Sequence, residues 1–226
     1  MRQLLATASL VLIAGCSSMP DAASSASDAP DGRSPLAIPF KGAASYAEAL
    51  QTWRSAEDVN AWIGARFEYD MSRAILLSET QRSKNGTLPI ARPDEFFAYP
   101  RGVCVDLSRF AVETLRVVDP QAKPSFLMIE FAPVSIAGNT LRLHWLAAFR
   151  HGGSYYFFAD SKRPGHIAGP YATTQEFMQA YEKYRGRQIV AFRELASYER
   201  KTRTTVGVPA MAVRAALERP RIPTRP

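Results

Sequence analysis

The chain has 226 residues, 46% of them hydrophobic, and a formal net charge of +7. This length and apolar content predict one domain with a single sizeable core. The positive charge gathers near the end of the chain, since residues 185–226 hold ten Lys or Arg against three acids. No aromatic residues interleave with the basic ones beyond Val206, which argues against nucleic acid as a partner.

The first fifteen residues have the pattern of an export signal. A basic start at Arg2 precedes an apolar stretch, Leu4 to Gly15, that is too short to span a bilayer. Its end, Leu12-Ile13-Ala14-Gly15-Cys16, resembles a bacterial lipoprotein box, which implies cleavage before Cys16 and acylation of its thiol. A lipid-anchored protein of the bacterial envelope is expected. The residue after Cys16 also bears on localisation. An Asp at this position would keep the protein from the outer membrane, so Ser17 implies a protein anchored in the outer membrane and facing the periplasm.

Residues 16–43 predict a disordered tether, because Ser, Ala, Asp, Pro and Gly dominate and large apolar residues are almost absent. A folded domain is expected over residues 44–205. A capping signal at Ser55 with Asp58 predicts a helix, and a mixed segment then reaches a turn at 84–86. The loop to Pro100 contains one helical turn at 93–97, with Pro at its first position. The buried stripe of the first helix is Val59, Trp62, Ile63 and Phe67.

A second helix is predicted to begin at Cys104. There the helix dipole and unpaired N–H groups favour a thiolate, an imidazolium neighbour would lower the thiol pKa further, and Gly102 lets the backbone come close. With Cys16 lipidated, Cys104 has no partner, and such a thiol in an exported protein indicates intermolecular pairing or a reactive group. The alternative is an inert, buried cysteine. The apolar positions at the spacing of one helical face are Leu107, Ala111, Leu115 and Val118.

Short apolar and aromatic runs separated by Gly and Asn follow, a pattern typical of strands. Gly152-Gly153 marks a hairpin tip. A three-residue loop over 151–153 would pair His144 directly with Asp160 on one sheet face, whereas a two-residue loop would shift the pairing by one and weaken this geometry. The expected elements are strands over 126–131, 141–149, 155–159 and 188–194, a Pro/Gly loop over 161–170, a helix over 174–184, and a basic, Pro-rich, poorly ordered tail over 206–226.

This order of elements resembles the transglutaminase-like superfamily over roughly residues 46–195. A Gly-x-Cys-x-Asp element that opens a helix is matched by Gly102, Cys104 and Asp106, a His that opens a strand by His144, and an Asp that ends the next strand by Asp160. The branch that the chain most resembles is the bacterial transglutaminase-like cysteine proteinases. Two upstream stretches look like the family's aromatic-Tyr-Asp and Pro-x-Glu elements, namely Phe67-Glu68-Tyr69-Asp70 and Pro93-Asp94-Glu95-Phe96.

The resemblance implies an α+β, papain-like fold, in which the helix bearing the Cys packs on an antiparallel sheet bearing His and Asp. It implies a catalytic triad of Cys104, His144 and Asp160 that forms an acyl-enzyme from a peptide or isopeptide amide. Water would resolve the acyl-enzyme by hydrolysis, or an amine by transamidation. The Cys104 N–H would bind the oxyanion, with Gln81 or Tyr99 as the second donor.

Some family members hold calcium through acids that flank the nucleophile, but Val103 and Val105 stand at these positions here. Neither a cofactor nor a metal is therefore expected, and a zinc site made from the three triad residues would be one ligand short. Asp106 is interpreted as a structural acid that serves the helix dipole and a nearby N–H.

Other interpretations fit the same residues. Judged alone, His144 also fits a core histidine and Asp160 a cap for the turn at 161–164. The expected partner is a protein or peptide of the envelope, and the alternative is an inactive envelope binding module of the same fold. The basic tail is interpreted as solvated, or else as a contact for an anionic envelope polymer or lipid headgroups.

Overall fold

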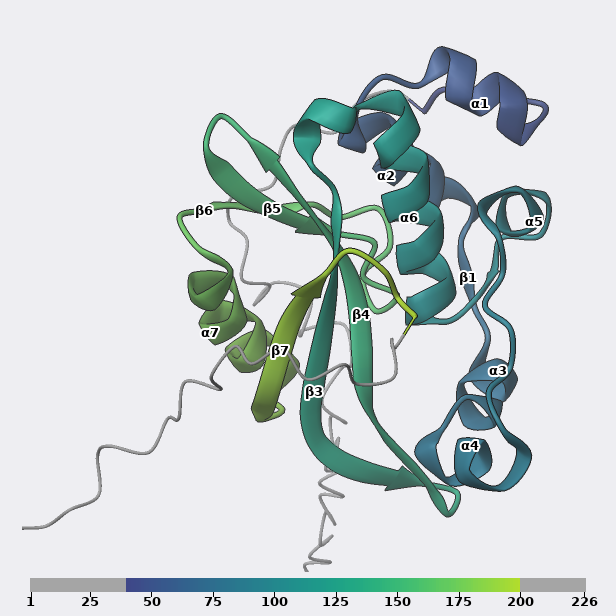
Figure 1. The fold of residues 1–226 in the computed structure, drawn as a ribbon, viewed down its shortest axis with the longest axis vertical. Helices are drawn as coiled ribbons and strands as arrows, with labels where there is room; N and C mark the ends of the chain where they lie inside the picture. Colours follow the sequence, from purple (N-terminus) through teal and green to yellow (C-terminus); the bar gives the residue numbers. More distant parts are fainter. Residues whose placement is uncertain (1–39, 200–226) are drawn as a thin grey trace, which may run out of the picture.

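The computed structural model describes residues 40–199, which form three layers: a twisted sheet with helices on both of its faces (Figure 1). The predictions for Cys16, for the tether up to residue 39 and for the tail over 206–226 lie outside the described residues. None of the helices within residues 40–199 is long and apolar enough to cross a membrane.

Five strands make the main sheet, in the order β6-β5-β4-β3-β7, and each neighbouring pair is antiparallel. A separate parallel pair, β1 with β2, ties the segment before α3 to the segment before α6. The predicted α+β architecture with an antiparallel sheet is confirmed. The strands are β1 (Glu68–Tyr69), β2 (Arg101–Gly102), β3 (Ser125–Ile136), β4 (Asn139–His151), β5 (Ser154–Phe158), β6 (Ala168–Tyr171) and β7 (Ile189–Leu195).

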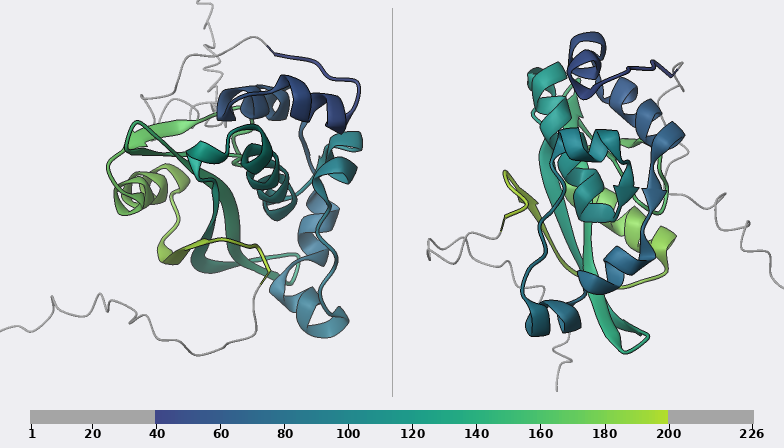
Figure 2. Two further views of the ribbon diagram at one scale, coloured as in Figure 1. Left: turned by 45° about the horizontal axis from the view of Figure 1, so that its top comes forward. Right: turned by 90° about the vertical axis from the view of Figure 1, so that its right-hand side faces the viewer.

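Helix α6 packs across one face of the sheet together with α1, α2 and α5, and α7 covers the opposite face (Figure 2). Of the described helices α6 is the longest, at 15 residues. The helices are α1 (Tyr46–Thr52), α2 (Ala56–Arg66), α3 (Met71–Leu76), α4 (Glu79–Asn85), α5 (Pro93–Ala98), α6 (Cys104–Val118) and α7 (Thr174–Arg185), with a 3₁₀ turn at Pro120–Ala122.

The core is divided by the sheet, because successive side chains of a strand point to opposite faces. On β4, Trp145 and Ala147 belong to the cluster under α6, whereas Leu146 and Ala148 belong to the cluster under α7. The face of α6 was predicted correctly, and its apolar positions at 107, 111 and 115 are fully buried. The helix that Ser55 caps also forms, since its hydroxyl accepts from the N–H of Asp58.

Two short helices, α3 and α4, occupy the segment that was predicted only as mixed, and β6 lies inside the predicted Pro/Gly loop. The hairpin tip lies at Gly152-Gly153 as predicted, and of the two loop lengths left open the two-residue loop forms, the one expected to weaken the pairing of His144 with Asp160. Gly152 and Gly153 alone form the turn, so His151 pairs with Ser154 and Ala147 with Phe158. Both glycines have positive φ angles of 58° and 82°, which suits the two-residue turns that match the twist of the strands.

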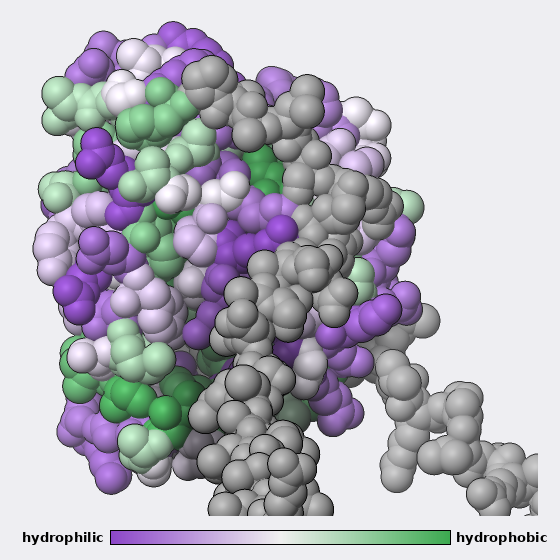
Figure 3. Space-filling model, turned by 180° about the vertical axis from the view of Figure 1, so that it is seen from behind, coloured by the Kyte–Doolittle hydropathy of each residue, from purple (hydrophilic) through white to green (hydrophobic). Residues whose placement is uncertain are grey.

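The face shown in Figure 3 carries both polar and apolar side chains, with an apolar region at its lower left. Two of the exposed large hydrophobic side chains, Met71 and Leu76, belong to α3. This short helix and α4 stand beside the far end of the β3–β4 hairpin (Figure 1), where Gln81 of α4 donates to Asn139 of β4 at 2.9 Å.

Candidate active site

Cys104 is the first residue of α6, as predicted, and its side chain is partly buried. The chain enters this helix through β2, which ends at Gly102. A Cβ on Gly102 would lie 3.0 Å from the Cβ of Asp106 and 3.2 Å from the ring of Phe96. Only a residue without a side chain lets the segment before the thiol lie this close to the first turn of the helix.

The first turn of α6 is held by Asp106, which is fully buried. Its carboxylate accepts from Arg73 twice, from Nε and Nη2, both at 2.7 Å. It also accepts the backbone N–H groups of Val103 at 3.1 Å and Ala91 at 3.0 Å. Asp106 thus joins α3, the loop before α5 and the start of α6. Its contacts agree with the structural role predicted for it, since every one is to a group of the scaffold.

The thiol of Cys104 lies near the part of β4 that has no hydrogen-bonding partner on its β5 side. Strand β5 ends at Phe158, which pairs with Ala147, so β4 continues toward residue 144 without a β5 neighbour. In this part of β4, the backbone N–H of Trp145 lies near enough to the sulfur of Cys104 to favour the thiolate and lower the thiol pKa. The thiol is therefore close to the residue that directly follows His144 on β4.

His144 and Asp160 form a buried pair. Nε2 of His144 lies 3.1 Å from Oδ1 of Asp160, and the two residues are 6% and 7% exposed. The observed register would continue to place Asp160 opposite Trp145, on the wrong face for His144. Ala159 changes this, because its φ of 59° is in the left-handed region, rare for a residue with a Cβ. The chain turns there, and the carboxylate reaches the imidazole despite the shifted register.

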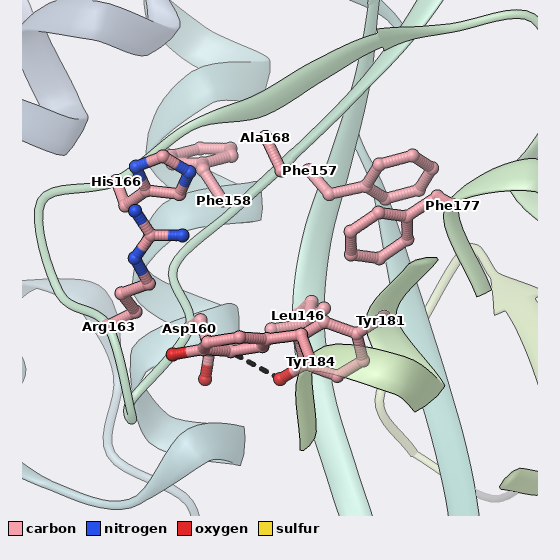
Figure 4. Close-up of a pocket in the computed structure, with 10 residues that line it drawn as sticks. All are labelled: Leu146, Phe157, Phe158, Asp160, Arg163, His166, Ala168, Phe177, Tyr181 and Tyr184. Carbon is pink, nitrogen blue, oxygen red and sulfur yellow. Dashed lines mark hydrogen bonds between the residues drawn. The ribbon is translucent and has the colours of Figure 1, made fainter. Parts of the chain in front are cut away.

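Asp160 also caps the loop that follows it. Oδ1 accepts the N–H of Lys162 at 2.9 Å, and the backbone carbonyl accepts the N–H of Arg163 at 2.9 Å. The two interpretations of Asp160, as the partner of His144 and as a turn cap, are therefore both correct. Its second oxygen, Oδ2, accepts the hydroxyl of Tyr181 at 2.7 Å (Figure 4).

The loop over residues 161–167 is pressed onto α2 at a pair of glycines. A Cβ on Gly165 would lie 2.7 Å from the Cα of Gly64, and one on Gly64 would lie 2.8 Å from the Cα of Gly165. Contacts this short do not occur for real side chains, so both positions require glycine. The loop that begins at Asp160 is thereby fixed against the layer of helices that contains α6.

Burial dominates the protonation of the site. It raises the pKa of the Cys104 thiol to about 11, although the N–H groups of Trp145 and Val105 favour the thiolate. It lowers the pKa of His144, against the effect of Asp160. Burial opposes the ionisation of Asp160, but the hydrogen bond and charge of His144, with help from Arg185, lower the pKa of Asp160 below its usual range.

The resting site therefore favours a neutral thiol and a neutral imidazole beside an ionised carboxylate. Burial thus works against the lowering of the thiol pKa that was predicted from the start of the helix and an imidazolium neighbour.

Tyr69 is a further residue at the thiol. It pairs with Gly102 in the parallel β1–β2 ladder, two residues before Cys104. Burial is the main cause that raises the pKa of Tyr69 to about 12, and negative charge on Cys104 is the second. The ammonium of Lys162 lies 4.7 Å from the centre of the Tyr69 ring. The phenol thus stays protonated at neutral pH and remains a hydrogen-bond donor.

The two residues proposed from sequence as oxyanion donors are placed differently. The side-chain amide of Gln81 donates to Asn139 near the distal end of the β3–β4 hairpin, and the side chain of Tyr99 is 66% exposed. Tyr69 was quoted only as part of a family element. Its pairing with Gly102 could have been the signal, but ladders of two residues leave little pattern in a sequence.

His151 ends β4 at the hairpin, and His166 lies in the loop after Asp160. Within the part of the chain that the structure describes, no three His, Cys, Asp or Glu side chains gather as metal ligands would.

Residues 44–189, more than half of the chain, match the model of a family described as a transglutaminase-like domain. No match was found among curated proteins.

Proposed function

This chain belongs to the transglutaminase-like family, and from that premise we propose that it is a cysteine-dependent amide hydrolase or transamidase. The observation that carries the proposal is the meeting of three elements: Cys104 opens α6, its thiol lies near the backbone N–H of Trp145, and the adjacent His144 is paired with Asp160. This is the arrangement that nucleophile, base and orienting acid need for covalent acyl transfer.

The hydrogen bonds define the role of each nitrogen of the imidazole. An ionised carboxylate can only accept, so the bond to Asp160 requires Nε2 of His144 to carry its proton. Nδ1 is then the nitrogen with a free lone pair. It takes the proton of the thiol as the sulfur attacks the carbonyl carbon, and it returns this proton to the leaving amine. Water or a second amine then attacks the thioester and takes up the acyl group, and the thiol of Cys104 is regenerated.

The oxyanion of the tetrahedral intermediate needs hydrogen-bond donors near the sulfur, in addition to the base His144. The N–H of Cys104 is one, because the first amides of a helix have no partner within it. We propose the phenol of Tyr69 as the second, in place of Gln81 and Tyr99. Its position beside Gly102 and its raised pKa both support this role.

The test is the pH dependence of alkylation by iodoacetamide. At pH 7 the buried thiol of Cys104 is almost wholly protonated, so its reaction depends on proton transfer to His144. We expect His144→Ala to react much more slowly than the wild type near pH 7, and the two rates to converge near pH 11, where the thiol ionises without a base. Cys104→Ser identifies the labelled residue. Equal rates at pH 7 would contradict the proposal.

A second candidate function is an envelope binding module that keeps the fold without turnover. The raised pKa of Cys104 favours it, since an inert buried cysteine has the same property. Slow labelling at pH 7 that does not depend on His144 would support this candidate.

We propose further that the protein is anchored through lipidated Cys16 to the outer membrane, facing the periplasm, and acts on envelope proteins or peptides. The support is the sequence Leu12-Ile13-Ala14-Gly15-Cys16 at the end of a short apolar stretch. The basic residues near the C-terminus are proposed to contact an anionic envelope polymer.

The anchor has a direct test. We expect mass spectrometry of the mature chain to find an acylated Cys16 as the first residue, and we expect Cys16→Ser to release the protein from the membrane fraction. A mature N-terminus without acyl groups, or Cys16→Ser that stays membrane-bound, would contradict the anchor while leaving the proposed chemistry intact.

A further inference from the structure

We infer that Tyr181 and Arg185 of α7 are positioning residues for the triad, so that the active site extends through the sheet to the helix on its other face. The inference rests on the proposed function for its catalytic meaning, but it is argued from contacts that do not involve Cys104. These contacts form a continuous chain from the half-buried Arg185 to the buried His144.

The chain has three links. Nη1 of Arg185 donates to the hydroxyl of Tyr181 at 2.8 Å, and this hydroxyl donates to Oδ2 of Asp160 at 2.7 Å. Oδ1 of Asp160 faces Nε2 of His144 at 3.1 Å. The ring of Tyr181 also lies parallel to the imidazole, with an interplanar angle of 15° and 6.2 Å between centres. Tyr181 is 3% exposed.

The direction of each hydrogen bond in this chain is fixed. A guanidinium has no lone pair to offer, so Arg185 must donate and the oxygen of Tyr181 must accept. The single proton of that hydroxyl is then available for the carboxylate alone. With Tyr181 and the N–H of Lys162 both donating to it, Asp160 is held as an acceptor, which leaves His144 as its third donor.

The consequence concerns the basicity of His144. A carboxylate that already accepts a hydrogen bond from a phenol attracts the proton of an imidazole less strongly than a carboxylate without that bond. Tyr181 therefore holds Asp160 in place and also limits how strongly Asp160 favours the imidazolium. This keeps Nδ1 of His144 unprotonated, as a base for the thiol.

Other groups act on the same pair from the elements around it. Arg185 and Tyr181 face it from α7, Lys162 from the loop after Asp160, and Cys104 from α6. Behind Asp160 lies a cavity of about 20 Å³, shown in Figure 4, with room for roughly one water molecule. The polar side chains that line it are those of Asp160, Arg163, His166, Tyr181 and Tyr184.

The test is an NMR titration of His144 in the full chain, a readout that needs no substrate and no reaction at Cys104. We expect Tyr181→Phe to raise the pKa of His144 by about one unit, because Asp160 loses a donor to its charged form while Arg185 keeps its charge. The pH at which His144-dependent iodoacetamide alkylation sets in should move upward by the same amount, because the imidazole must lose its proton before it can act as the base. The exposed His151, at the β4–β5 hairpin, serves as an internal reference.

Tyr155→Phe is the matched control. It removes another Arg–Tyr hydrogen bond of 2.7 Å, from Arg150, at the opposite end of β4 from His144. We expect no change in the pKa of His144. Should Tyr181→Phe fold poorly, Arg185→Met tests the same chain, and an upward shift is again expected.

The outcomes distinguish the positioning role of Tyr181 from the proposed function of the chain. A pKa of His144 that is the same in wild type and Tyr181→Phe, or that shifts equally in Tyr155→Phe, would overturn the positioning role. Alkylation that ignores His144 while its pKa still shifts in Tyr181→Phe would contradict the proposed function and leave the positioning role standing.

Discussion

Replacing Asp160 with Asn is expected to lower amide turnover by on the order of 10³- to 10⁴-fold, the size of effect known for the equivalent change in a serine triad. An Asn that keeps its oxygen toward His144 and the N–H of Lys162 turns its NH₂ toward Tyr181, whose own proton then loses its acceptor. An Asn that flips gives His144 a donor and forces the wrong tautomer. In either orientation the imidazolium loses the charge that supports it.

Stability should respond differently. Asn with its oxygen toward the N–H of Lys162 still caps the loop but leaves the proton of Tyr181 unpaired, so its melting temperature should fall by less than that of Asp160→Ala. Asp160→Ala leaves three donors unpaired, two of them buried, and should melt well below both the wild type and Asp160→Asn. The measurements are melting temperature and the His144-dependent part of the Cys104 alkylation rate for both variants. If alkylation is unchanged in both, Asp160 acts only as a cap, and a dyad of Cys104 and His144 remains.

The largest loss of stability is expected at Asp106. Asp106→Ala leaves the guanidinium of Arg73 and the N–H groups of Val103 and Ala91 without their acceptor. Breaking a buried ion pair in this way costs about 3–5 kcal/mol. For a domain of this size that corresponds to a melting temperature lower by roughly 6–20 °C.

Asp94→Ala is the matched control, since it removes an ion pair with Arg92 in which both side chains are more than half exposed. A change of less than about 1 kcal/mol in the free energy of unfolding is expected there. Thermal or urea unfolding of both variants checks the comparison. Equal, small effects would show that Asp106 does not hold the start of α6.

The parts of the fold that the sequence predicted are those with a strong local pattern. The buried face of α6 repeats at helical spacing over 15 residues, and its Cys stands at the first position. Helices α3 and α4 have only six and seven residues, too few for a period to be recognised. Strand β6 contains Gly169 and Pro170, which read as loop residues.

The site shows the same limit. His144 and Asp160 were paired on the assumption of a three-residue turn, yet the turn has two residues and the contact depends on the left-handed backbone of Ala159. No sequence rule marks an alanine for that conformation. Tyr181 and Arg185 were missed because the helix was predicted to end at residue 184, before Arg185, and because a Tyr on a helix face is typical of a core position. Their hydrogen bonds become visible only once α7 lies on the sheet.

The contact between Gly64 and Gly165 has a consequence for how the sequence of this transglutaminase-like domain can vary. Neither residue carries a functional group, and Gly64 belongs to a helix some forty residues before Cys104. Yet their close approach holds the loop that begins at Asp160 against that helix. The smallest possible change at either position, the addition of one methyl group, would force the two backbones apart and so disturb the segment that carries the partner of His144.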